Sequence, residues 1–198
     1  ERELLEWLPV GSICTTARIP RGKGLLTPET MPAYKAQALT LAVTFADRDI
    51  DVVVYGCTAD GFIAGPSGEA ELAAELSQVT GKSVVTTAIS MVLTLQEARA
   101  KDIALITPYP DHINEQLLIF LKEGGIRVKR LDSFRVADVE DLGRISSDAV
   151  ADRSRATMGR DCDALFIACS QLPTYHILDS LETEFGRPAW SSIKATAW

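Results

Sequence analysis

The chain has 198 residues, of which 46% are hydrophobic and 24% charged, and its formal net charge is −7. This length and composition are typical of a globular chain of one or two domains and exclude disordered, collagen-like and coiled-coil proteins. The acidic balance argues against a nucleic-acid-binding protein, because no stripe of Lys and Arg is available to neutralise phosphates. It leaves room for a small anionic ligand, since one local pocket can oppose the net charge.

The sequence also bears on location and on metals. No apolar run reaches the 18 or more residues of a membrane span, and the first residues lack the pattern of a signal peptide. The four cysteines are not accompanied by any sign of a small disulfide-rich scaffold, so we expect free thiols and a cytoplasmic protein. With two histidines and no CxxC motif, we expect no metal site.

Short β-branched apolar runs alternate with helical patterns along the chain. In chain order, the sequence predicts helices at 28–48, 69–80, 88–100, 111–124, 138–159 and 174–185. Between them it predicts strands at 50–56, 82–87, 103–107, 127–130, 164–168 and 188–192. The glycine-rich run at 21–24 lacks the spacing of a phosphate-binding loop and predicts an ordinary loop. Near-continuous apolar strands separated by amphipathic helices indicate an α/β fold with parallel strands covered on both faces.

An internal two-fold repeat organises the chain. Three matches recur in the same order. They are Glu3-Leu4-Leu5-Glu6-Trp7-Leu8 with Gln116-Leu117-Leu118-Ile119-Phe120-Leu121, then Gly56-Cys57-Thr58 with Ala168-Cys169-Ser170, and last Gly81 and Thr86-Thr87 with Gly186 and Ser191-Ser192. We therefore expect two α/β half-domains related by a pseudo-two-fold axis, with the active site in the cleft between them. The first would comprise residues 1–87 plus 188–198 and the second residues 88–187. The repeat also predicts that the first half lacks its opening strand.

Cys57 and Cys169 are the strongest catalytic candidates. Each follows a predicted buried strand and precedes a polar turn and a helix, and ligands of open α/β sheets bind at such strand ends. Backbone N–H groups of the turn and the positive end of a helix favour a thiolate and an adjacent carboxylate. Two thiols facing one carbon suit proton abstraction and delivery, or thiolate addition to a double bond with the second thiol as acid. The alternative is that each is a small buried hydrophobic residue, but their equivalent places in the repeat favour catalysis.

Several motifs resemble one known group of enzymes. They are Gly56-Cys57-Thr58, Ile106-Thr107-Pro108-Tyr109 with Asn114-Glu115, Phe166-Ile167-Ala168-Cys169-Ser170, and the closing run from Ser191 to Trp198. The chain resembles the aspartate/glutamate racemase superfamily, and within it the maleate cis-trans isomerase and arylmalonate decarboxylase branch. The resemblance implies two α/β half-domains around one active site, a small carboxylate substrate, no cofactor and a homo-oligomer.

The resemblance also assigns residues. It makes Cys57 the N-terminal and Cys169 the C-terminal catalytic cysteine, and it makes Tyr109 a donor to the substrate carboxylate. The turn residues whose N–H groups would hold that carboxylate are Thr58, Ala59 and Ser170. Relatives often have Ser at the position of Ala59, so one hydroxyl donor is missing here. The stretch at 60–66 is more similar to a branch associated with ectoine catabolism, which leaves the substrate open.

Some residues and functions keep two interpretations. Tyr109 is either a substrate contact or an ordinary aromatic residue at a strand end, and Asn114 is either a helix-start residue or a partner of Tyr109. His112 and His176 are expected at the surface. The function that fits best is a cofactor-independent two-cysteine isomerase or racemase acting on a small carboxylate or dicarboxylate. The alternatives are an arylmalonate-type decarboxylase, which needs only one proton donor, and a ligand-binding relative without catalysis.

Overall fold

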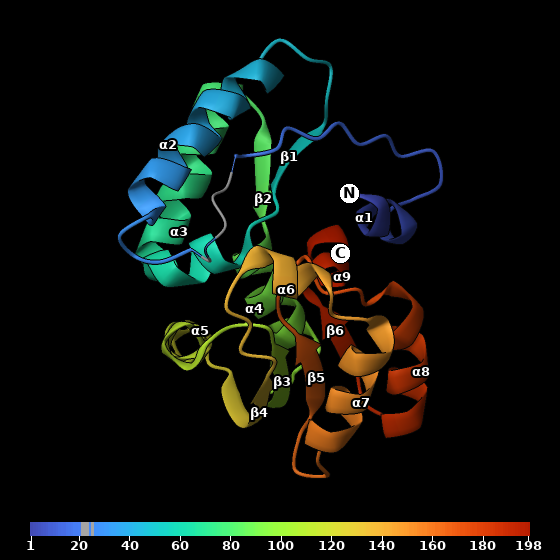
Figure 1. The fold of residues 1–198 in the computed structure, drawn as a ribbon. Helices are drawn as coiled ribbons and strands as arrows, with labels where there is room; N and C mark the ends of the chain where they lie inside the picture. The colour runs from blue at the N-terminus through green and yellow to red at the C-terminus, as the bar shows by residue number, and fades with distance from the viewer. Residues whose placement is uncertain (21–23, 25) are drawn as a thin grey trace.

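The computed structural model describes residues 1–20, 24 and 26–198 and confirms the α/β fold with parallel strands (Figure 1). The helices in chain order are α1 (Arg2–Trp7), α2 (Met31–Ala42), the 3-10 helix η1 (Val43–Phe45), α3 (Thr58–Thr80), α4 (Thr87–Glu97), α5 (Asp111–Glu123), α6 (Val139–Gly143), α7 (Ser147–Thr157), α8 (Tyr175–Phe185) and α9 (Ser192–Ala197). The strands are β1 (Val52–Tyr55), β2 (Ser83–Thr86), β3 (Asp102–Thr107), β4 (Arg127–Ser133), β5 (Ala164–Ile167) and β6 (Ala189–Ser191). In this part of the chain, no helix is both long and apolar enough to cross a bilayer.

The strands form two parallel sheets. In the smaller sheet β1 pairs with β2, so that Tyr55 lies opposite Thr86. The larger sheet has the order β4-β3-β5-β6, with the apolar strands β3 and β5 at its centre. Helix α5 lies on one side of this sheet and α7 and α8 on the other, which explains why β5 is buried and apolar throughout and β3 is buried beyond its first residue, Asp102 (Figure 1).

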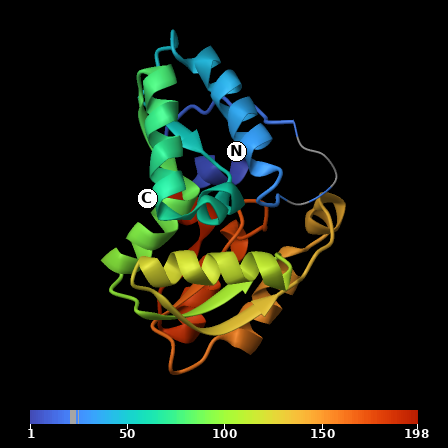
Figure 2. The same cartoon turned by 90° about the vertical axis from the view of Figure 1, so that its left-hand side faces the viewer.

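Two hydrophobic cores match the two sheets. The larger core surrounds β3 and β5 and includes the side chains of Phe62 and Phe120. The smaller core lies where α2 and α3 cover β1, and it is built from Ala38, Ala42, Tyr55, Leu72 and Leu76. Figure 2 shows α2 and α3 beside each other in the upper part of the molecule, with α5 beneath the first stretch of α3.

The internal repeat is visible in the structure. Gly81 and Gly186 occupy the same place in the two halves, since each ends a helix in the left-handed conformation, with φ of 66° and 60°. Glycine favours this conformation because it has no Cβ. Strands β2 and β6 are each followed at once by a helix, α4 and α9 respectively.

One segment of the predicted half-domain division lies elsewhere. The sequence grouped 188–198 with the first half, but β6 pairs with β5 in the larger sheet, because that buried strand needs a partner on its second edge. Helix α9 then leaves this sheet and packs against α4 and α1. The other boundaries of the two half-domains stay a prediction.

The local differences from the predicted elements have clear causes. Helix α3 begins at Thr58 rather than at residue 69, and it bends at Gly65, whose φ of 71° and ψ of 172° interrupt the helix before Pro66. The helix predicted at 138–159 is divided into α6 and α7, and the short helices α1 and α9 were not predicted. Of the loop predicted at 21–24, residues 21–23 lie outside the described residues, and Gly24 forms an isolated antiparallel bridge with Asp138.

Candidate active site

Cys57 lies at the junction between β1 and α3. It is the N-cap residue of α3, with extended backbone angles, and its side chain is half-buried. The first N–H groups of a helix have no acceptor within the helix, and together they carry a positive partial charge. Cys57 therefore stands where the backbone favours an anion.

Cys169 follows β5 in a strained conformation. Its φ is 127°, and only 6% of the residue is exposed. A non-glycine residue in such a conformation costs about 1–3 kcal/mol and persists only where its surroundings hold it. The preceding Ala168 N–H donates to the carbonyl of Ile106 at 2.8 Å, which fixes the end of β5 against β3.

Hydrogen bonds join the two cysteine turns. The Ser170 hydroxyl donates to the carbonyl of Gly56 at 2.6 Å. The Thr58 hydroxyl donates to Ser192 Oγ at 3.2 Å, and the Cys169 N–H donates to the same oxygen at 2.9 Å. Gly56 is thus bound directly to the turn of Cys169, and Thr58 is joined to it through Ser192, so the structure brings these two segments, far apart in sequence, to one place.

The two predicted carboxylate-binding residues that follow Cys57 form the first turn of α3. Thr58 is buried and Ala59 is half-buried. Because their N–H groups belong to the start of the helix, they are available to a ligand at this end. The hydroxyl of Thr58 is directed to Ser192, so the backbone is the part of Thr58 that remains for a carboxylate.

Tyr109 lies beside the first stretch of α3. It follows β3, is 5% exposed, and its ring packs edge-on against Phe62 with centroids 5.4 Å apart. Its carbonyl accepts a hydrogen bond from Asn114 Nδ2 at 2.9 Å, while Asn114 Oδ1 accepts one from the Thr107 hydroxyl at 2.7 Å. Asn114 is therefore the backbone partner of Tyr109, which was one of its two predicted roles.

Two buried carboxyl groups of α3 were not recognised in the sequence. Asp60 Oδ2 accepts a hydrogen bond from the Tyr55 hydroxyl at 2.7 Å, and Glu69 Oε1 accepts one from Thr86. Burial raises the pKa of both carboxyl groups, and the hydrogen bonds from Tyr55 and Thr86 only partly oppose this effect. An acidic residue in the first turn is typical of a helix start, and Asp60 is such a residue in α3. The sequence did not predict a helix there, because Gly61 and Gly65 follow and glycine disfavours helix.

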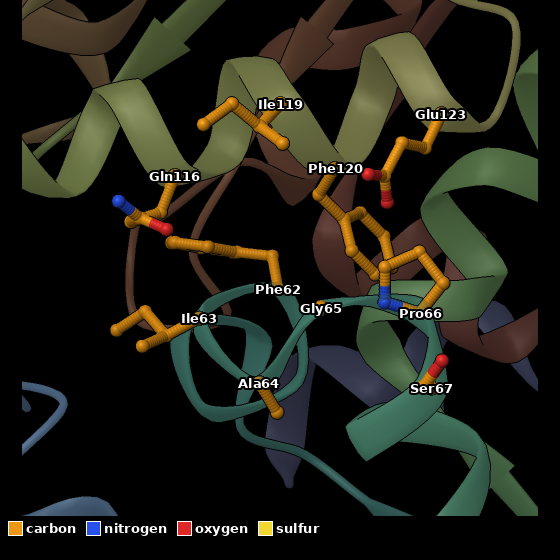
Figure 3. A pocket seen from close by; sticks show the side chains of 10 residues that line it. All are labelled: Phe62, Ile63, Ala64, Gly65, Pro66, Ser67, Gln116, Ile119, Phe120 and Glu123. Carbon is orange, nitrogen blue, oxygen red and sulfur yellow. The ribbon is translucent and has the colours of Figure 1, made fainter.

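Other features lie away from these turns. His112 and His176 are exposed, as expected, and no group of three potential metal ligands occurs in the described ranges. A cavity of about 260 Å³ lies between the bend of α3 and α5, lined by Phe62, Ile63, Ala64, Gly65, Pro66, Ser67, Gln116, Ile119, Phe120 and Glu123 (Figure 3). None of the six candidate site residues lines this cavity.

Comparisons with known proteins agree with this fold. The maleate isomerase of Nocardia farcinica is 28% identical over 179 residues, which cover 87% of this chain and 71% of the relative. The arylmalonate decarboxylase of Bordetella bronchiseptica is 26% identical and covers 89% of this chain and 75% of its own. A solved structure of the Nocardia farcinica maleate cis-trans isomerase, a cysteine-to-serine mutant with a covalently bound succinylcysteine intermediate, matches with a TM-score of 0.88 at 26% identity, covering 98% of this chain and 81% of that one.

A family model described as arylmalonate decarboxylase matches residues 21–198. That span includes both cysteine turns, Tyr109 and every strand of the two sheets. The resemblance found in the sequence is therefore confirmed, and the chain belongs to the arylmalonate decarboxylase family, which includes relatives that are maleate isomerases.

Proposed function

We propose that this protein is a cofactor-independent isomerase that uses Cys57 and Cys169 on a small carboxylate or dicarboxylate. The observation that carries the proposal is the set of hydrogen bonds by which Gly56 binds Ser170 directly and Thr58 shares the oxygen of Ser192 with the Cys169 N–H. Two thiols held at one site by a common frame can act on one substrate carbon or on two adjacent carbons. A single thiol has no such partner for the second proton transfer.

For a cis-enedioate such as maleate, the chemistry is addition followed by elimination. The thiolate of one cysteine forms a bond to one alkene carbon, and the π electrons move to the adjacent carbon and its carboxylate. The former double bond is now single and rotates, after which the carbon–sulfur bond breaks and returns its electrons to the thiolate. The second cysteine gives a proton to the carbanionic carbon and takes it back before elimination.

The N–H groups of Thr58, Ala59 and Ser170 and the hydroxyl of Tyr109 would hold the substrate carboxylates. Fixed donors aimed at the oxygen where charge develops stabilise an enediolate more strongly than mobile water does. The covalent succinylcysteine of the Nocardia farcinica enzyme supports the addition route, because it is the product expected when a thiolate adds to maleate and the adjacent carbon is protonated.

The proposal is tested with the variants Cys57→Ser and Cys169→Ser. Maleate, aspartate, glutamate, hydantoins and ectoine-derived acids are each incubated with enzyme in heavy water, and double-bond isomerisation and deuterium at Cα are measured. We expect each variant to lose about 100-fold or more of the turnover, since a general acid or base contributes about that much. Cys14→Ser serves as the matched control and should retain normal turnover. Near-normal activity of both site variants would contradict the two-thiol mechanism.

Arylmalonate-type decarboxylation is the second candidate function, and the relative from Bordetella bronchiseptica supports it. It needs one proton donor, because loss of CO2 itself generates the carbanion. Release of CO2 from a substituted malonate that depends on Cys169 but not on Cys57 would favour it. A ligand-binding protein without catalysis would turn over none of these compounds and would show two slowly alkylated thiols.

We also propose a cytoplasmic location and a homo-oligomeric state. The four cysteines are free, as is usual in a reducing compartment. The link to ectoine catabolism is likewise a proposal, and turnover of the ectoine-derived acids in the panel of test compounds given above would support it. Size-exclusion chromatography with light scattering measures the oligomeric state.

A further inference from the structure

Ser192 occupies a central place between the two cysteine turns. It is the first residue of α9 and is fully buried. Its Oγ accepts the N–H of Cys169 at 2.9 Å and the hydroxyl of Thr58 at 3.2 Å. One oxygen atom therefore binds the turns of both candidate catalytic cysteines.

The turn of Cys169 requires such an acceptor. Cys169 holds φ at 127°, which L residues rarely adopt, and a buried N–H without an acceptor is costly. Beyond this turn, the Leu172 N–H donates to the Cys169 carbonyl at 3.2 Å. The oxygen of Ser192 thus supplies the contact that keeps the Cys169 amide in its strained orientation.

The position of Ser192 is itself fixed by buried hydroxyl groups. The Thr196 hydroxyl binds the Ser192 carbonyl at 2.7 Å and Thr87 Oγ1 at 3.1 Å. The Thr87 hydroxyl donates to the carbonyl of Tyr55 at 3.1 Å, at the end of the strand that leads to Cys57. Helix α9 is thus bound through Thr196 and Thr87 to the smaller sheet. The strand directly before α9, β6, belongs to the larger sheet.

We infer that Ser192 is a positioning residue for the two-cysteine reaction, holding the Cys169 turn in its strained conformation and in register with Thr58. The expected effect on kcat rests on the proposed function, whereas the expected effects on cysteine alkylation and on the Cys169 amide do not. Ser192 is not assigned contact with substrate, so it acts through Cys169 and through the helix start that follows Cys57.

The test compares Ser192→Ala with Ser191→Ala. Ser191 is an adjacent buried serine, and its hydroxyl oxygen accepts the N–H of Lys194 as the cap of α9, whereas the hydrogen bonds to Thr58 and Cys169 are made by Ser192. For each protein we measure kcat and KM on the substrate identified by the panel. Iodoacetamide alkylation of each cysteine is followed by peptide mass spectrometry, and circular dichroism records folding.

We expect Ser192→Ala to lower kcat about tenfold or more while KM changes less than about threefold. The freed turn should expose the Cys169 thiol, so alkylation of Cys169 should become about fivefold faster while buried Cys162 remains as slow as before. Ser192→Thr, which keeps the oxygen, should restore both values. Ser191→Ala should change neither.

Three outcomes would overturn the inference. One is equal acceleration at Cys169 and Cys162, which would indicate general loosening of the fold. Another is equal behaviour of the Ser192→Ala and Ser191→Ala variants. The third is measured on the unmodified protein. If the Cys169 amide exchanges its hydrogen as fast as an amide without a hydrogen bond, the bond from this amide to Ser192 does not form. If no compound of the panel is turned over, the proposed function fails, while alkylation and exchange still decide the role of Ser192.

Discussion

Glu69 and Gly61 are in direct contact inside α3, so closely that a Cβ on Gly61 would lie 2.5 Å from Glu69 Oε2. The same Cβ would lie 2.5 Å from the Cβ of Ala88 in α4. No side chain fits between these atoms. The glycine therefore allows the first stretch of α3, which carries the candidate carboxylate-binding turn, to approach α4.

Gly61→Ala should destabilise the protein. Overpacking in a tight interior site costs about 1–3 kcal/mol, and here both neighbours are buried. Urea unfolding gives the free energy of unfolding. Gly143→Ala in α6 is the matched control, because its Cβ would meet nothing within 4 Å, and it should be neutral or stabilising. Equal effects of the two substitutions would mean that the contact around Gly61 relaxes freely.

Glu69→Gln should change how stability depends on pH. Burial raises the pKa of Glu69, so above its ordinary value of 4.5 the native state retains a proton that the unfolded chain releases. The contribution of this group to stability is thus complete at low pH and declines as pH rises, by at most about 1.4 kcal/mol per pH unit. The variant lacks this decline.

Urea unfolding at several values between pH 4 and 8, for the unmodified protein and the glutamine variant, measures this difference. The stability of the unmodified protein relative to the variant should fall with rising pH. A difference that stays constant with pH, or that grows in favour of the unmodified protein, would contradict a raised pKa.

Cys169→Gly and Cys169→Ala should reverse the usual order of stability. Glycine ordinarily costs about 0.5–1 kcal/mol relative to alanine, but at a φ of 127° it relieves strain that alanine retains. We expect the glycine variant to have the higher melting temperature. The same pair at Cys162, which is buried but has no positive φ, should show the ordinary order with alanine more stable. Alanine being more stable at both sites would argue against strain at Cys169.

Asn114→Ala should lower both stability and turnover. It leaves the Tyr109 carbonyl without this amide donor and the Thr107 hydroxyl without its acceptor, both at buried positions. Unsatisfied buried groups cost about 1–3 kcal/mol. Because Tyr109 is the proposed carboxylate donor, KM should rise as well. Glu115→Ala on the exposed face of the same helix is the control. Equal changes of stability and KM in the two variants would contradict the proposed link between Asn114 and Tyr109.

The sequence predicted the parts of the fold that depend on local pattern. Five of the six strands lie within their predicted ranges or extend one residue beyond them, because β-branched apolar runs bounded by polar turns favour strands. Strand β4 begins at the predicted Arg127 but continues to Ser133, three residues beyond its predicted end. Both cysteine turns were recognised because strand ends and repeat positions coincide. Gly81 and Gly186, which the sequence shows as equivalent positions of the repeat, both end helices in the left-handed conformation.

What could not be predicted depends on tertiary contacts. Two glycines and a proline in 61–66 argue against helix locally, yet packing against α4 and α5 makes this stretch helical up to Gly65. The role of Ser192 needs a contact with Cys169, 23 positions away in sequence, and another with Thr58, 134 positions away. The short helix α9 owes its stability to α4 and α1 rather than to its own six residues.

The interruption of α3 at Gly65 has a consequence for the sorting of ligands. The helix resumes after Pro66, so a second positive helix end borders the cavity of Figure 3. The carboxylate of Glu123 lies opposite Pro66 there, and the polar side chains of Ser67 and Gln116 also line the cavity. A negative charge of the protein, that of Glu123, thus lines the same cavity as this helix end and disfavours the binding of a second anion there. We therefore expect a carboxylate ligand to be disfavoured in this cavity, in contrast to the turns of Cys57 and Cys169.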